Sequence, residues 1–137
     1  MTEAQNWDVV IFDDVKPDAT PLRNFLRAHG LSVKLFTRLA DLEQSLAAGL
    51  RARCVIFDFL LAAENETTLP FIKQHVGAIR AANIRIIVLT ADRDSGDLAE
   101  ARRIEGVEVM RRPLVDRQAL VRGIIELLGR PTPDTIL

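Results

Sequence analysis

The stretch Val9-Val10-Ile11-Phe12-Asp13-Asp14 gives the first indication of the fold. Four apolar residues are followed by two aspartates, and in Cys54-Val55-Ile56-Phe57-Asp58 four apolar residues are followed by one. Short apolar runs rich in β-branched residues are typical of strands that helices cover on both faces of a parallel sheet. The sequence predicts five strands, at Val9–Phe12, Val33–Phe36, Cys54–Phe57, Ile84–Leu89 and Val107–Met110. The first, third and fourth are apolar throughout, whereas Val33-Lys34-Leu35 alternates like a strand nearer an edge.

Longer stretches with helical spacing separate these strands. In the first stretch, Thr20 can cap a helix, Pro21 suits its first position, and Gly30 can end it in a left-handed conformation. Strands that alternate with helices are joined by right-handed crossovers, which indicates an α/β fold with helices on both faces of an open sheet. The other predicted helices run from about Leu39 to Leu46 or beyond, with Gly49 after it, from near Thr67 or Thr68 to about Ile79, over Gly96–Ile104, and from near Asp116 to Gly129.

The composition is that of one packed domain. The chain has 137 residues, of which 48% are hydrophobic and 27% charged, so it is neither a disordered chain nor a coiled coil. Its formal charge of -1 leaves no basic excess for nucleic-acid binding. We find no signal peptide and no membrane span, and expect a cytoplasmic protein. The single cysteine, Cys54, is predicted to be a buried apolar residue.

Polar residues stand where four of the predicted strands end, and in an open parallel sheet this is where ligands bind. They are Asp13, Asp14, Asp58, Thr90 and Arg112. If the first and third strands are neighbours, three carboxylates meet, and like charges at short range favour a bound cation such as Mg²⁺. Taken singly, each aspartate could equally be a helix cap or a turn former.

These elements resemble the receiver domains of two-component response regulators over roughly residues 8–129. The resemblance rests on Val10-Ile11-Phe12-Asp13-Asp14, Val55-Ile56-Phe57-Asp58, Val88-Leu89-Thr90-Ala91 and Met110-Arg111-Arg112-Pro113-Leu114. It implies a flavodoxin-like, doubly wound sheet of five parallel strands in the order 2-1-3-4-5. The expected receiver domain is 1–129, and residues 130–137, with two prolines, are expected to be a tail or the start of a linker.

The resemblance also implies a function, that of a phosphorylated signalling domain rather than an enzyme. Asp58 would accept a phosphoryl group from a histidine kinase or phosphotransfer protein. Mg²⁺ would be held by Asp13, Asp14, Asp58 and the backbone carbonyl of Leu60, while Thr90 would hydrogen-bond a phosphoryl oxygen. The phosphorylated form would act on a downstream protein target or a fused output domain, and a homodimer is an open option.

Three positions depart from the pattern of the family. Arg112 replaces a lysine, and its planar guanidinium could hold the phosphoryl group, pair with unmodified Asp58, or simply reflect an arginine-rich composition. Val109 stands where the family usually has an aromatic residue that rotates on activation. The segment after Asp58 lacks the family's Met-Pro pair and later glycine, and it carries Glu64 and Glu66.

Two alternatives therefore stay open beside the phosphorylated receiver. A degenerate receiver would serve as a docking or dimerisation module without phosphorylation, as Arg112 and Val109 would allow. An aspartyl phosphatase similar to the haloacid dehalogenase group would need a second aspartate at the position of Leu60. The length leaves no room for a fused output domain, so we expect a stand-alone receiver or the N-terminal part of a longer protein.

Overall fold

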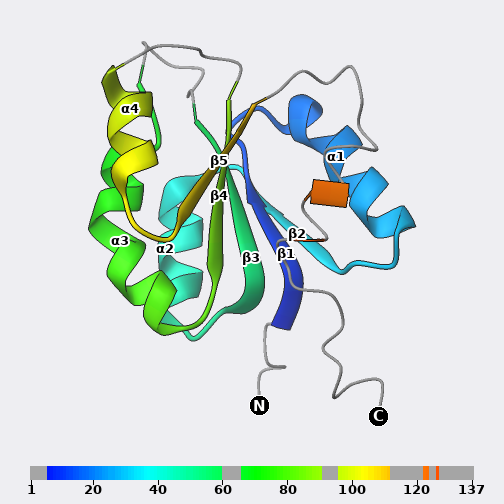
Figure 1. The fold of residues 1–137 in the computed structure, drawn as a ribbon. Coiled ribbons are helices and arrows are strands. Elements are labelled where there is room, and N and C mark those ends of the chain that lie inside the picture. The colour runs from blue at the N-terminus through cyan, green and yellow to red at the C-terminus, as the bar shows by residue number, and fades with distance from the viewer. Residues whose placement is uncertain (1–5, 60–65, 91–95, 112–121, 124–125, 127–137) are drawn as a thin grey trace.

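A parallel sheet lies between two layers of helices (Figure 1). The computed structural model describes residues 6–59, 66–90, 96–111, 122–123 and 126. The strand order is β2-β1-β3-β4-β5, which confirms the predicted fold class. The strands are β1 (Asn6–Phe12), β2 (Val33–Phe36), β3 (Arg51–Asp58), β4 (Arg85–Thr90) and β5 (Val107–Arg111), and the helices are α1 (Lys16–Ala28), α2 (Leu39–Ala47), α3 (Leu69–Ala81) and α4 (Gly96–Arg103).

The two faces of the sheet have separate apolar cores. In β1, Val9 and Ile11 pack with α1 residues such as Leu26, whereas Val10 and Phe12 belong to the larger cluster on the side of α2, α3 and α4. These four side chains of β1 are each at most 2% exposed. Burying such a side chain contributes about 1.5–3 kcal/mol, so apolar residues are favoured at consecutive positions where a central strand is covered on both faces. This arrangement accounts for the uninterrupted runs in the sequence.

The start of α1 differs from the prediction. The helix begins at Lys16 and has Pro17 in its first turn, so Pro21 lies inside it and Thr20 is not the cap. The hydroxyl of Thr20 instead donates to the backbone carbonyl of Lys16 at 2.9 Å. Pro17 fits the first turn because N–H groups there have no partner within the helix, so its missing N–H costs no hydrogen bond. The helix then continues through Pro21, where one backbone hydrogen bond is lost.

The ends of three helices follow one backbone pattern. Gly30 and Gly49, at φ of 86° and 95°, follow α1 and α2 as predicted, and Asn83, at φ of 63°, follows α3. After α1, the Leu31 N–H donates back to the Leu26 carbonyl at 3.3 Å and the Gly30 N–H to the Arg27 carbonyl at 2.9 Å. These paired bonds satisfy the last carbonyls of the helix, and they require a left-handed residue.

The remaining helix predictions are confirmed where the structure describes them. Helix α3 begins after Thr68 and has Pro70 in its first turn, and α4 buries Leu98 and Ala101 as expected. Residues 122, 123 and 126 are helical, but the rest of the helix predicted from Asp116 to Gly129, and the tail at 130–137, lie outside the described residues. Among the described residues, no helix combines the length and apolar character that crossing a bilayer requires.

Cys54 lies fully buried in the α1-side core, as predicted. Burial raises the pKa of its thiol from an ordinary 9.0 to about 12, while the positive charge of Arg85 acts in the opposite direction. The thiol therefore stays protonated at neutral pH and behaves as an apolar side chain.

Candidate functional site

Asp13 stands at the turn between β1 and α1 and is only 1% exposed. Its N–H donates to the Phe36 carbonyl of β2 at 3.0 Å, which extends the sheet by one step beyond Phe12. Its Oδ1 accepts the Val15 N–H at 2.9 Å, so this carboxylate also forms the turn into α1. Asp13 is thus a turn former, and its fixed turn places a carboxylate at the carboxyl end of the sheet.

Asp14 and Asp58 bring two further carboxylates to the same place. Strands β1 and β3 are neighbours in register, with Phe12 opposite Phe57, so the residues that follow them meet at one edge. One oxygen from each of Asp13, Asp14 and Asp58 lies within 4.8 Å of the other two. The structure therefore brings together the three aspartates that the sequence placed in one site.

This donor set fits Mg²⁺. Mg²⁺ prefers oxygen ligands at about 2.1 Å in octahedral geometry, which separates neighbouring ligand oxygens by about 3 Å. The three carboxylate oxygens lie within 4.8 Å of one another, so side-chain rotations that draw them together would bring them to coordination distance. A cation would also offset the repulsion among three like charges.

Thr90 ends β4 at the same edge and is 2% exposed. In the pairing of β3 with β4, Asp58 lies opposite Leu89, so Thr90 lies one residue further along the adjacent strand. Val109, in β5 opposite Val88, is partly buried against the larger core cluster. The structure thus places Thr90 at the same edge of the sheet as the carboxylates.

Other predicted site residues fall outside the part of the chain that the structure describes. These are Arg112 and the backbone carbonyl of Leu60, and Glu64 of the segment after Asp58 also lies outside it. Glu66 is described and exposed. Arg112 and Leu60 therefore stay predictions from the sequence.

Sequence reasoning missed one residue of the site. Thr68 was predicted only as the start of a helix, yet its hydroxyl donates to the backbone carbonyl of Asp58 at 3.0 Å. The side chain is fully buried. The sequence carries no pattern that indicates this bond, because its two partners lie ten residues apart.

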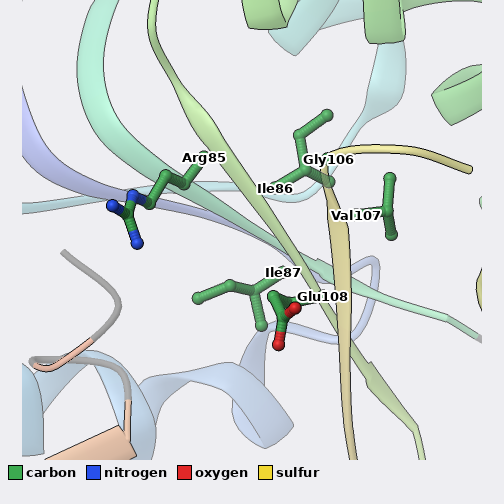
Figure 2. A pocket seen from close by; sticks show the side chains of 6 residues that line it. All are labelled: Arg85, Ile86, Ile87, Gly106, Val107 and Glu108. Carbon is green, nitrogen blue, oxygen red and sulfur yellow. The ribbon is translucent and has the colours of Figure 1, made fainter.

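A pocket of about 260 Å³ lies at the opposite end of the sheet (Figure 2). It is lined by the amino-terminal ends of β4 and β5, from Arg85 to Ile87 and from Gly106 to Glu108. Because the strands are parallel, these ends are remote from the carboxyl ends that carry Asp58 and Thr90. The position of the acidic cluster, rather than this pocket, identifies the candidate site.

Comparison with known proteins gives matches in structure only. No protein-family model and no curated protein sequence matches the chain. A two-component response regulator from Clostridium difficile superimposes with a TM-score of 0.73 at 15% identity, over 90% of this chain and 97% of that one. A response regulator receiver protein from Burkholderia phymatum has a TM-score of 0.71 at 24% identity, over 91% and 97%.

A third neighbour belongs to a different kind of parent protein. It is the signal receiver domain of a signal transduction histidine kinase from Syntrophus aciditrophicus, with a TM-score of 0.70 at 18% identity, over 92% of this chain and 94% of that one. At these identities the likeness shows the fold. The chain has the CheY-like fold of response regulator receiver domains, as its sequence motifs predicted.

Proposed function

We propose that this protein is a receiver of two-component signalling that is phosphorylated on Asp58 in a Mg²⁺-dependent reaction. The observation that supports the proposal is the cluster of three carboxylates, Asp13, Asp14 and Asp58, within 4.8 Å at the carboxyl ends of β1 and β3. In the receiver fold this edge of the sheet is where a ligand would bind. The proposed domain is 1–129.

In the proposed reaction, a carboxylate oxygen of Asp58 attacks the phosphorus of a phosphohistidine on a histidine kinase or phosphotransfer protein. An O–P bond forms, the N–P bond breaks, and the histidine nitrogen leaves with the electron pair, giving an aspartyl phosphate. The surroundings of Asp58 must balance the charge of the transferring group and hold it in line.

Each neighbouring residue has a role in this proposal. Asp13, Asp14, Asp58 and the Leu60 carbonyl would hold Mg²⁺, which supplies positive charge opposite the phosphoryl oxygens. Asp13, fixed by the Val15 N–H, gives the site a rigid ligand. Thr90 would donate its hydroxyl proton to a phosphoryl oxygen, and Arg112 would add a positive charge.

The phosphorylated protein would then act by binding a downstream protein target or a fused output domain. Asp58 is well placed for such coupling because β3 lies at the centre of the sheet and adjoins β4 and its Thr90. We do not propose phosphatase activity, because Leu60 stands where the haloacid dehalogenase pattern needs a second aspartate.

Calorimetric titration with Mg²⁺ tests the metal site and separates this function from a degenerate docking module. We expect wild type to bind one Mg²⁺ and Asp13→Asn to bind it at least tenfold more weakly. As a control, Asp41→Asn removes an exposed aspartate from the first turn of α2 and should leave the affinity unchanged.

Arg112→Lys belongs in the same series. If Arg112 pairs with Asp58 and occupies the site, the lysine variant should bind Mg²⁺ more tightly than wild type does. Absence of binding in both proteins would contradict the proposed function and favour the docking module.

A further inference from the structure

Thr68 ties the start of α3 to the end of β3. Its N–H donates to the Phe59 carbonyl at 2.9 Å, and its hydroxyl donates to the Asp58 carbonyl at 3.0 Å. Phe59 is itself held by β4, because its N–H donates to the Leu89 carbonyl at 3.0 Å. The main chain of the proposed phosphoacceptor is therefore fixed from two sides.

The hydroxyl of Thr68 is not used as a helix cap. Thr68 occupies the N-cap position of α3, but its side chain makes no capping hydrogen bond to the helix. Instead this fully buried hydroxyl reaches a carbonyl ten residues back in the chain. Its bond therefore contributes to the position of Asp58 rather than to the helix terminus.

Thr67 links the same junction to α4. Its hydroxyl donates to Asp97 Oδ2 at 3.1 Å and accepts the Leu69 N–H at 3.2 Å. Asp97 lies in the first turn of α4. Further along, Lys73 of α3 forms an ion pair with Glu100 of α4.

We propose that Thr67 and Thr68 form a junction that positions Asp58 and connects its main chain to α4. The inference rests on the proposed function, since it gives the junction its role at the phosphorylated residue. Thr68 sets where the Asp58 carboxylate stands relative to Asp13 and Asp14, and Thr67 transmits a displacement of that main chain to Asp97. Both threonines are positioning residues, because neither touches the reacting atoms.

The positioning role is tested with Thr68→Val and Thr68→Ser in Mg²⁺ titrations of the full chain. Valine keeps the shape and removes the hydroxyl, so we expect Mg²⁺ affinity to fall about fivefold, which corresponds to one lost hydrogen bond. Serine should restore the affinity to within about twofold. Thr20→Val is the matched control, because Thr20 also donates to a backbone carbonyl, at 2.9 Å, but in α1.

A merely structural role would lower the free energy of unfolding of Thr68→Val without changing its Mg²⁺ dissociation constant. That result, obtained with a variant that urea unfolding shows to be folded, would overturn the positioning role.

The connection to α4 is tested by hydrogen exchange of residues 96–103 in the metal-free protein. We expect Thr67→Val and Thr68→Val to raise the exchange rate there several-fold, and Thr20→Val to leave it unchanged. Unchanged exchange in both variants would overturn the connection. The exchange measurement needs neither metal nor phosphoryl group. If wild type fails to bind Mg²⁺, the proposed function is contradicted, but the exchange rates of residues 96–103 still show whether Thr67 and Thr68 are connected to α4.

Discussion

Removing one charge from the acidic cluster should stabilise the metal-free protein. Asp13→Asn keeps an Oδ1 acceptor for the Val15 N–H and removes a negative charge from a residue that is 1% exposed. At 4.8 Å, two unit charges repel by about 0.9 kcal/mol in water and by about 3.5 kcal/mol at an effective dielectric constant near 20. Because Asp14 and Asp58 are partly exposed, we expect a gain of about 2 kcal/mol in the free energy of unfolding.

Mg²⁺ should then narrow the difference in unfolding free energy between Asp13→Asn and wild type. A ligand at a hundred times its dissociation constant adds about 2.7 kcal/mol to the stability of the protein that binds it, and the variant should gain much less. Urea unfolding with and without Mg²⁺ measures both effects, and high salt should reduce the gain of the metal-free variant. The control, Asp41→Asn, removes an exposed charge elsewhere and should show neither effect. A metal-free Asp13→Asn less stable than wild type, together with no response of wild type to Mg²⁺, would refute this reasoning.

Further predictions concern the backbone and the buried thiol. A Cβ at Gly49 or at Gly77 would meet no atom within 4 Å, so only backbone conformation distinguishes the two sites. In urea unfolding, Gly49→Ala, at φ of 95°, should cost about 1–2 kcal/mol, whereas Gly77→Ala, inside α3, should add about 0.5–1 kcal/mol, and equal effects would be contrary to the assigned helix end. The Cys54 thiol should react with a disulfide reagent at pH 8 only when urea unfolds the protein, because burial raises its pKa to about 12, and rapid labelling of the folded protein would disprove its burial. The folded state holds the Cys54 thiol proton more tightly than the unfolded state does. The contribution of this group to the free energy of unfolding is therefore fully present below pH 9 and is lost as the pH rises toward 12.

The central part of the fold was predictable because burial constrains it strongly. Strands such as β1 and β3 are covered on both faces, so their apolar runs are uninterrupted, and the aspartates that follow them mark the strand ends. Helix ends were predictable at Gly30 and Gly49, where a left-handed residue is needed. The left-handed Asn83 after α3 was not predicted, since asparagine in a polar stretch gives a weaker signal than glycine.

The errors and omissions arise where local patterns compete or where contacts are distant in sequence. Pro17 and Pro21 both suit a helix start, and the sequence does not show that the helix tolerates the second one. The bond from Thr68 to Asp58 spans ten residues and depends on how the intervening segment returns to the sheet, which no periodicity reveals. Composition and spacing thus located the carboxylates of the candidate site, but not the residue that supports them.

The most direct test of the proposed function is phosphorylation of Asp58 itself. The full chain is incubated with Mg²⁺ and a small phosphodonor, and intact mass is measured for wild type, Asp58→Asn and the charge control Asp41→Asn. We expect wild type and Asp41→Asn each to gain one phosphoryl group, with no gain in Asp58→Asn or when Mg²⁺ is chelated. Wild type that gains no phosphoryl group under conditions that label an ordinary receiver, or an Asp58→Asn variant labelled as fully as wild type, would contradict the proposed function.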